Sequence, residues 1–167
     1  MYNYPHFLSG IVYMSVELVV FDLDFTLWDC DGVWCDCTTP PFKKQGSQVT
    51  DSLNRSIRLY SDVLSILEHC QSLNLKMALA SRTSEPEWAK QLIALHQIED
   101  YFIQNEIYPG SKITHFKQLQ SNLNIAYKNM LFFDDEMRNI KEVGGLGVKA
   151  VYVEQGLNWR LIDAHLS

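Results

Sequence analysis

The stretch VVFDLDFTLW, residues Val19–Trp28, carries a run of apolar β-forming residues directly into two aspartates. Asp22 and Asp24 are separated by a single residue, and Thr26 follows two positions later. Two carboxylates this close together repel each other unless a cation lies between them. In an open parallel sheet, ligands bind outside the carboxyl ends of the strands. The stretch therefore predicts a buried strand that delivers two acids to a cation-binding site.

Short apolar segments alternate with amphipathic segments along the rest of the chain. The expected strands are Leu18–Phe21, Lys76–Ser81, Tyr101–Gln104, Asn129–Asp135 and Lys149–Val153. The expected helices are Ser61–Ser72, a helix that begins at a capping box of Ser84 and Glu87, Lys112–Gln120, Glu136–Val143 and Trp159–His165. Strands that alternate with helices indicate right-handed βαβ units. We therefore predict an α/β fold, a doubly wound Rossmann-like parallel sheet of about five strands.

The chain of 167 residues is expected to form one domain, residues 17–167, behind an N-terminal extension of residues 1–16. Because Met14 lies just before the first strand, residues 1–13 are interpreted as a dispensable extension or an over-long gene start. Residues 29–58 form the least regular stretch and are expected to be an irregular loop or a short flap. So short an insertion predicts a fold without a cap domain.

The composition argues against several classes of partner. The net charge of −6 gives no general electrostatic attraction to nucleic acid or to an anionic membrane. Apolar runs fall short of the roughly 20 residues of a membrane helix, and the first residues lack the features of a signal peptide. A cytoplasmic monomer is expected. Cys30, Cys35, Cys37 and Cys70 are interpreted as reduced thiols. A zinc site is the less favoured alternative, because C-x4-C-x-C is not a common ligand spacing.

Polar side chains that follow the predicted strands should meet at one edge of the sheet. They are Asp22, Asp24, Thr26, Ser81, Arg82, Thr83, Lys112, Asp134 and Asp135. Hard carboxylate oxygens are the ligands that Mg²⁺ prefers, and a lysine and hydroxyls suit phosphate oxygens. One acid could then attack phosphorus to form an aspartyl-phosphate, while a second protonates the leaving oxygen. These residues predict a magnesium-dependent phosphoryl-transfer site.

Four short motifs, DLDFT, ASRT, PGSK and FFDDE, resemble the ordered motifs of the haloacid dehalogenase superfamily of phosphotransferases. Within that superfamily the chain resembles the small magnesium-dependent phosphatases linked to phosphotyrosine, over about residues 18–157. The resemblance implies that Asp22 is the nucleophile and a metal ligand. It implies that Asp24 is the general acid and base, with its backbone carbonyl on the metal, and that Thr26 braces their loop.

The resemblance extends to the later motifs. It implies that Ser81 and Arg82 contact the substrate phosphate and that Lys112 pairs with the nucleophile and the phosphate. It makes Asp135 a metal ligand with Asp134 in support, and leaves open which of the two reaches the metal directly. The cysteine- and aspartate-rich middle of the loop WDCDGVWCDCTTPPF departs from the family pattern, so the substrate is open between phosphotyrosine or phosphoprotein and small phosphorylated metabolites. Trp28 and Trp34 either wall the substrate entrance or cover the core.

Two other functions are weighed against a phosphomonoester hydrolase. A receiver-like phospho-acceptor signalling module also combines acids, a hydroxyl, a lysine and Mg²⁺ on a parallel sheet. In such a module, however, the lysine follows the acids, whereas Lys112 precedes Asp134 and Asp135. The same fold could also serve a phosphomutase or a non-hydrolytic binding protein. The short stretches between motifs leave little room for the cap that mutases of the superfamily carry.

Overall fold

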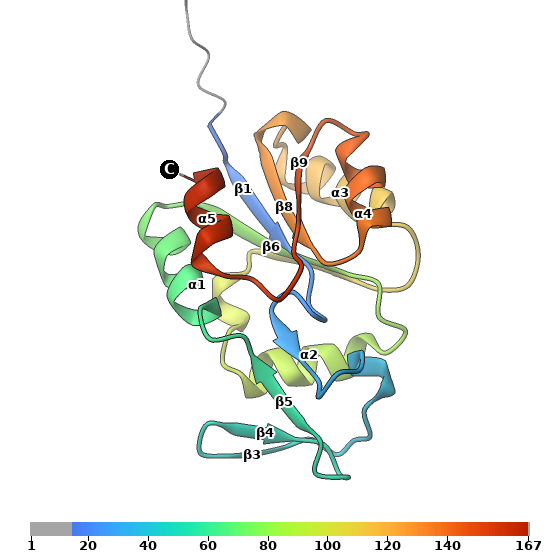
Figure 1. Cartoon of the computed structure of the whole chain (residues 1–167). Coiled ribbons are helices and arrows are strands. Elements are labelled where there is room, and N and C mark those ends of the chain that lie inside the picture. The colour runs from blue at the N-terminus through green and yellow to red at the C-terminus, as the bar shows by residue number, and fades with distance from the viewer. Residues whose placement is uncertain (1–14, 167) are drawn as a thin grey trace, which may run out of the picture.

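A computed structural model describes residues 15–166 of the chain, and its centre is a parallel five-stranded sheet (Figure 1). The strand order is β7 (Gln104–Ile107), β6 (Lys76–Ser81), β1 (Leu18–Phe21), β8 (Met130–Asp134) and β9 (Lys149–Tyr152). All four neighbouring pairs are parallel. The predicted Rossmann-like α/β fold is confirmed. Most of the predicted N-terminal extension, residues 1–14, lies outside the described residues.

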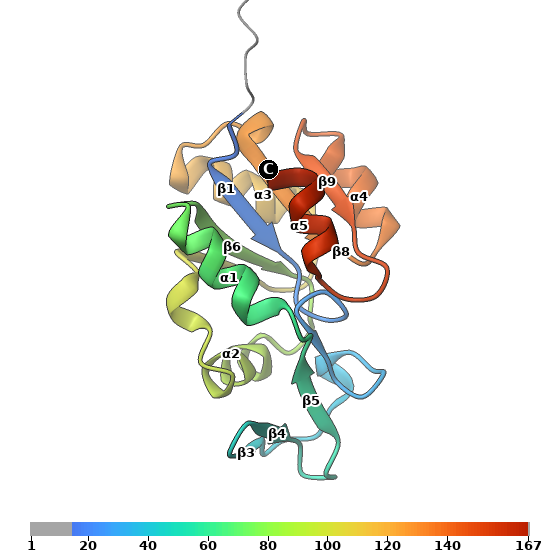
Figure 2. The same cartoon turned by 60° about the vertical axis from the view of Figure 1, so that its left-hand side comes forward.

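Helices cover both faces of this sheet. They are α1 (Val63–Ser72), α2 (Pro86–Leu95), α3 (Lys112–Leu123), α4 (Met137–Gly144) and α5 (Trp159–Leu166). Successive side chains of a strand point to opposite faces, so β1 contributes to two cores. Val19 and Phe21 pack in the core under α1, α2 and α5, whereas Leu18 and Val20 pack in the core under α3 and α4. Figure 2 shows α1 and α5 together on the near side of the sheet.

Two sequence predictions about elements are wrong. The strand expected at Tyr101–Gln104 lies three residues later, because β7 is an edge strand that carries polar residues and the preceding apolar run packs into the core through Phe102. The capping box of Ser84 and Glu87 does not form. Helix α2 starts at Pro86, a residue suited to the first helical position. The other predicted elements agree with the observed bounds to within three residues.

Residues 28–59, which we call the flap, follow β1 and leave the carboxyl edge of the main sheet (Figure 1). The flap contains a second sheet in the order β2 (Trp28–Asp29), β5 (Ser56–Leu59), β4 (Gln48–Thr50) and β3 (Lys43–Gln45), and a 3-10 turn η1 (Cys35–Cys37). Its strands pair antiparallel. This stretch therefore contains short regular elements.

A buried carboxylate holds the flap together. Asp51 is 1% exposed, and it accepts hydrogen bonds from the backbone amides of Thr39, Leu53 and Arg55 at 3.1, 3.0 and 2.8 Å. Three amide donors stabilise the charged carboxylate, and the guanidinium of Arg55 lies 3.6 Å from Asp51 Oδ2. The flap therefore combines this polar centre with buried apolar residues such as Val49 and Ile57, which join the core of the main domain.

Two further expectations concern the cysteines and the membrane. All four cysteines are free thiols, and Cys30, Cys35 and Cys70 are buried. Within residues 15–166, the only cluster with the spacing of metal ligands is made of aspartates, so the zinc alternative finds no support. None of the helices in this part of the chain is long and apolar enough to cross a membrane.

Candidate active site

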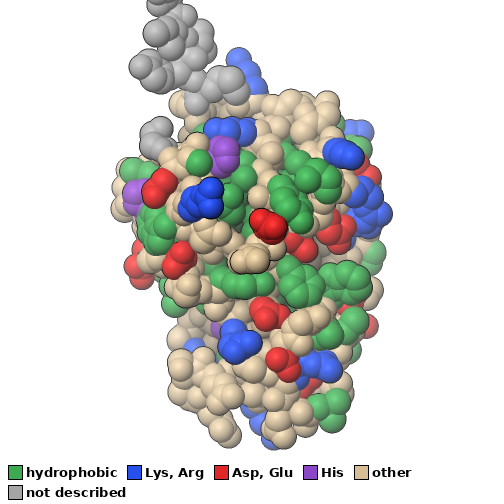
Figure 3. Space-filling view, in the orientation of Figure 1, with side chains coloured by type: hydrophobic (Ala, Val, Ile, Leu, Met, Phe, Trp, Pro, Cys, Tyr) green, Lys and Arg blue, Asp and Glu red, His purple; other side chains and the backbone are tan. Residues whose placement is uncertain are grey.

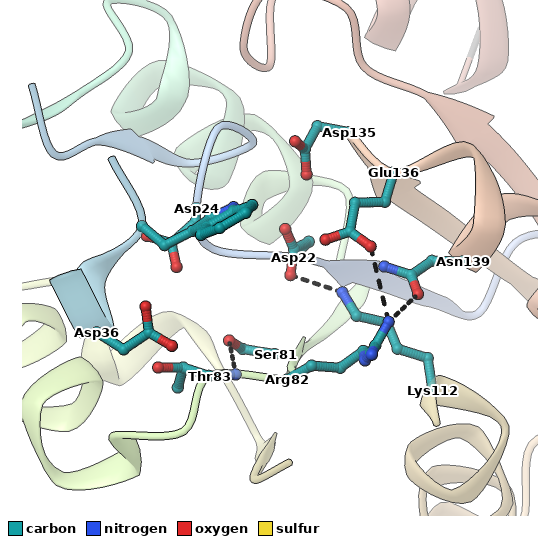
Figure 4. A pocket seen from close by; sticks show the side chains of 11 residues that line it. Asp22, Asp24, Asp36, Ser81, Arg82, Thr83, Lys112, Asp135, Glu136 and Asn139 are labelled. Carbon is teal, nitrogen blue, oxygen red and sulfur yellow. Dashed lines mark hydrogen bonds and ion pairs between the residues drawn. The ribbon is translucent and has the colours of Figure 1, made fainter. Parts of the chain in front are cut away.

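A pocket opens at the carboxyl edge of the main sheet (Figure 4). It is lined by Asp22, Asp24, Trp34, Asp36, Ser81, Arg82, Thr83, Lys112, Asp135, Glu136 and Asn139. The structure thus brings together most of the predicted site residues, from the ends of β1, β6 and β8 and the start of α3. Thr26 and Asp134 lie behind the pocket and are buried.

Lys112 links two acids at the floor of the pocket. Its ammonium lies 2.6 Å from Asp22 Oδ1 and 2.5 Å from Asp134 Oδ2, and its side chain is 1% exposed. The lysine is the first residue of α3, after the N-cap Ser111, whose hydroxyl accepts from the amide of Ile113 at 3.2 Å. Burial opposes the charge on Lys112, but the two carboxylates raise its pKa. The ammonium is therefore held charged between β1 and β8.

The three acids Asp22, Asp134 and Asp135 offer carboxylate oxygens that all lie within 4.8 Å of one another. Burial raises the pKa of Asp22 well above its ordinary value, and Asp134 and Asp135 raise it further although Lys112 opposes them. Burial, Asp134 and Glu136 raise the pKa of Asp135 to about 6. A single lysine does not offset this crowding of negative charge. The hard oxygen donors and their excess charge fit a magnesium ion.

The neighbours Asp134 and Asp135 have different surroundings. Asp134 Oδ1 accepts from the amide of Glu136 at 2.7 Å, and both of its oxygens accept from Asn139 Nδ2 at 3.1 Å. With Lys112 also bound, the Asp134 carboxylate is surrounded by donors. Asp135 instead lines the pocket and faces it beside Asp22 (Figure 4).

Asp24 lies at the opposite wall of the pocket from Lys112 (Figure 4). Its Oδ1 accepts from the indole of Trp28 at 2.7 Å and from the amide of Cys35 at 2.9 Å. Burial raises the pKa of Asp24, although these hydrogen bonds oppose the shift. The indole of Trp28 is fully buried behind Asp24. Trp34, in contrast, is 54% exposed and lines the pocket.

The turn after β1 gives Asp24 its position. Phe25 adopts a φ of 58°, and the amide of Thr26 donates to the carbonyl of Leu23 at 3.2 Å. The carbonyl of Thr26 accepts from the amide of Leu157 at 2.9 Å, while its buried hydroxyl has no hydrogen-bond partner within residues 15–166. Thr26 contacts its neighbours in this turn through its backbone.

The motif after β6 faces the pocket from below in Figure 4. Ser81 is buried, and its hydroxyl accepts from the amide of Thr83 at 3.4 Å. Arg82 donates to Asn139 Oδ1 at 3.2 Å and lies 3.6 Å from Glu136 Oε2. The guanidinium of Arg82 is therefore tied to α4 at the rim of the pocket.

Sequence reasoning missed Asp36, Glu136 and Asn139. Asp36 comes from η1 of the flap, and its Oδ2 accepts from the hydroxyl of Ser84 at 2.9 Å. This contact ties the flap to the loop before α2. No motif predicts it, because residues 29–58 were expected only to be an irregular loop or a short flap. The sequence could have indicated Asn139, because a polar residue at a buried position of a short helix needs a polar partner.

Comparison with known proteins agrees with this site. The sequence model of the acid phosphatase family matches residues 15–167. The human protein Magnesium-dependent phosphatase 1 is 45% identical over 152 residues, which cover 90% of this chain and 85% of the human protein. The chain belongs to the magnesium-dependent phosphatases of the haloacid dehalogenase superfamily. Magnesium-dependent phosphatases act on phosphorylated substrates, so this chain is a phosphatase with Mg²⁺ as its cofactor.

More distant relatives of this magnesium-dependent phosphatase extend the match. A haloacid dehalogenase-like hydrolase superfamily protein of Schizosaccharomyces pombe is 38% identical over 145 residues, covering 79% of this chain and 82% of that protein. A haloacid dehalogenase family enzyme of Bacteroides thetaiotaomicron, solved with magnesium and inorganic phosphate, has a TM-score of 0.65 at 16% identity. The superposition covers 87% of this chain and 98% of that structure, and it shows a shared fold.

The strand order of the phosphatase excludes the receiver alternative. Counted along the chain, its five parallel strands are arranged 3-2-1-4-5. Receiver modules have the flavodoxin-like order 2-1-3-4-5. The first strand, which carries Asp22 and Asp24, is therefore central and lies between the strands that end in Ser81 and Asp134. Membership of the phosphatase family likewise favours hydrolysis over a mutase or a binding protein.

Proposed function

We propose that this phosphatase hydrolyses phosphomonoesters through an aspartyl-phosphate formed on Asp22. The observation that supports the proposal best is the placement of Asp22 at the pocket floor, with one oxygen on the Lys112 ammonium at 2.6 Å. That contact fixes Oδ1 and leaves Oδ2 as the nucleophilic oxygen. A carboxylate fixed in this way can attack phosphorus in line with the leaving oxygen.

The first step exchanges one phosphorus–oxygen bond for another. An oxygen of Asp22 bonds to phosphorus as the ester bond to the leaving group breaks. The electron pair of that bond stays on the leaving oxygen, which takes a proton from Asp24. The alcohol or phenol departs, and the phosphoryl group remains on Asp22. Asp24 suits this role because it lies across the pocket from Lys112 and because burial raises its pKa.

The second step regenerates the carboxylate. Asp24, now ionised, accepts a proton from a water molecule whose oxygen attacks phosphorus. The bond between phosphorus and the Asp22 oxygen breaks, and inorganic phosphate leaves. Ser81, Lys112 and Arg82 are proposed to contact the phosphate oxygens throughout, because all three line the same pocket and two of them are cations.

Asp22, Asp135 and the backbone carbonyl of Asp24 are the proposed magnesium ligands, with Asp134 in support. When bound, the ion supplies a positive charge that lets phosphate and carboxylate oxygens approach each other. The carboxylates of Asp22 and Asp135 already lie close together, and burial together with the neighbouring acids raises both of their pKa values, although Lys112 opposes the shift.

We infer substrates with an accessible phosphate, either a phosphotyrosine side chain of a protein or a small phosphorylated metabolite. The exposed Trp34 at the pocket mouth offers an aromatic surface, which favours the phosphotyrosine alternative. Turnover of phosphotyrosine peptides, phosphoserine peptides and sugar phosphates, each with Mg²⁺, distinguishes the classes.

The mechanism is tested by Asp22→Asn. We expect turnover of p-nitrophenyl phosphate to fall by at least about a thousandfold, because the amide is not a nucleophile. Circular dichroism should show an intact fold. The control is Asp31→Asn, which alters an exposed aspartate of the flap and should retain activity. Undiminished turnover by Asp22→Asn would exclude an aspartyl-phosphate on this residue.

A further inference from the structure

Two N–H groups donate to the same oxygen of the Asp24 carboxylate. The indole of Trp28 and the amide of Cys35 donate to Oδ1 at 2.7 and 2.9 Å. The thiol of Cys30 approaches the same oxygen at 3.8 Å. The thiol of Cys35 also interacts with this carboxylate. Within residues 15–166, neither of the two N–H donors is on Oδ2, and Asp24 lines the pocket.

A carboxylate oxygen has two lone pairs in the plane of the group. Two N–H donors at these distances occupy both lone pairs of Oδ1, so a proton added to Asp24 resides on Oδ2. We propose that Trp28 and the Cys35 amide are positioning groups, which direct the protonated Oδ2 of Asp24 toward the leaving oxygen of the substrate. This inference rests on the proposed role of Asp24 as the general acid.

Both donors belong to the flap. Trp28 is the first residue of β2, where it pairs with Leu59, and its own carbonyl accepts from the amide of Phe25 at 2.8 Å. Cys35 is the first residue of η1, and its thiol lies 3.3 Å from Thr83 Oγ1. The flap is therefore attached both to the acid and to the loop after β6. Residues 15–166 of this phosphatase contain no cap domain, and the flap itself contacts the proposed general acid, Asp24.

A purely structural role for Trp28 has different consequences. A buried indole needs an acceptor for its N–H wherever it lies, and Trp28 is fully buried. If the hydrogen bond served packing alone, its loss would lower stability and would reduce activity toward all substrates alike. If it aims the acid, its loss should matter most for leaving groups that need protonation.

The test therefore compares leaving groups. Trp28→Phe keeps a ring in the core but removes the donor. For phenyl phosphate, whose phenol has a pKa near that of tyrosine at about 10, we expect kcat/KM to fall about 10- to 100-fold. For 2,4-dinitrophenyl phosphate, whose leaving group departs unprotonated, the fall should stay below about threefold. The control is Trp159→Phe, which removes an exposed indole hydrogen bond to Ser65 at 3.1 Å and should leave both substrates unaffected.

Cys35 supplies a matched pair of variants. Cys35→Pro removes the amide donor, and Trp34 before it has φ −72° and ψ 156°, the conformation that a residue before proline adopts. Proline is also suited to the first position of a helical turn. Cys35→Ala keeps the amide and removes the thiol. Both variants lose the thiol, which also interacts with Asp24, and only Cys35→Pro loses the amide donor. We therefore expect the selective loss with phenyl phosphate to be clearly larger for Cys35→Pro than for Cys35→Ala.

Asp24→Asn separates failure of this inference from failure of the proposed function. If Asp24→Asn loses phenyl phosphate selectively while Trp28→Phe and Cys35→Pro lower both substrates equally or not at all, the positioning role is wrong and the acid role stands. If Asp24→Asn itself shows no dependence on the leaving group, the acid role and the inference both fail. Should Trp28→Phe not fold, the pair at Cys35 decides.

Discussion

Among single residues, Asp134 and Asp135 show that two neighbouring aspartates can have different roles because their surroundings differ. Asp134 ends β8, is fully buried and accepts hydrogen bonds from Lys112, Asn139 and the amide of Glu136. These donors leave it no free face toward the pocket. Asp135, one residue later, faces the pocket and carries a pKa raised to about 6 by burial, Asp134 and Glu136. We infer that Asp135 contacts the magnesium directly and that Asp134 fixes Lys112.

The two asparagine variants should therefore differ. Asp135→Asn is expected to raise the Mg²⁺ concentration for half-maximal activity by at least about tenfold, because it removes a ligand charge. It should leave the melting temperature of the metal-free protein unchanged or higher, since one of three crowded charges is gone. Titration of activity with Mg²⁺ and thermal melts in EDTA measure both effects.

Asp134→Asn is the matched comparison. Removing one partner of the buried Lys112 should lower the free energy of unfolding by about 3 kcal/mol, even in EDTA. Denaturant unfolding followed by circular dichroism measures it. If the two variants exchange these phenotypes, the assignment of ligand and support is reversed.

At the level of elements, the flap is where the sequence and the structure differ most. Its strands are two to four residues long, and β3 (Lys43–Gln45) is exposed throughout, so no alternation of apolar and polar residues marks them. Hydrogen bonds from three backbone amides of the flap to Asp51 stabilise the segment instead. The strands of the main sheet were predictable because β1, β6 and β8 are buried on both faces and are nearly continuous in apolar residues. The edge strand β7 lacks that signal.

The residues of the candidate site likewise fall into those that the sequence predicts and those that depend on the path of the flap. Asp22, Asp24, Ser81 and Lys112 follow strands or a turn in the sequence, so the rule that ligands bind at the carboxyl ends of parallel strands predicts their convergence. Trp28 as a hydrogen-bond donor, and Asp36 as a link to Ser84, depend on the path of the flap. Local sequence patterns carry no information on that path.

Asp51→Ala tests whether the flap depends on its polar centre. Three backbone donors lose their acceptor and would lie partly buried without a partner, so the free energy of unfolding should fall by about 2 kcal/mol. Limited proteolysis should cut residues 39–55 faster than in the parent protein. Arg55→Ala is the control, because it removes the side-chain contacts of Arg55 with Asp51 at 3.6 Å and with the carbonyl of Cys37 at 2.8 Å but keeps the three amide donors. Equal protease resistance of Asp51→Ala and the parent would contradict this account.

For the molecule as a whole, the arrangement of charge matters more than its total. The net charge is −6, and acidic and basic side chains are interspersed on the face that Figure 3 shows. Against this mixed surface, the strand order 3-2-1-4-5 brings Asp22, which follows β1, and Asp134 and Asp135, at the end of β8, within 4.8 Å of one another. Folding therefore concentrates negative charge at one point. The metal-free protein should be less stable than the loaded one.

Magnesium should accordingly raise the melting temperature. At a concentration about 100 times its dissociation constant, a ligand specific for the folded state adds about 2.7 kcal/mol, which is about 5 to 10 °C for a protein of this size. The direction of the pH effect follows from Asp135. Because its pKa is raised to about 6 in the folded protein, the carboxylate is largely protonated at about pH 5 and must lose that proton to bind metal. The rise should therefore be smaller at about pH 5 than at about pH 7.

Differential scanning calorimetry with MgCl₂, and with NaCl of equal ionic strength as the control, measures the rise in melting temperature. Asp135→Asn should lose most of the rise, and EDTA should abolish turnover of p-nitrophenyl phosphate until Mg²⁺ is restored. If the melting temperature does not change on addition of Mg²⁺ and the protein stays fully active in EDTA, these aspartates do not bind the metal.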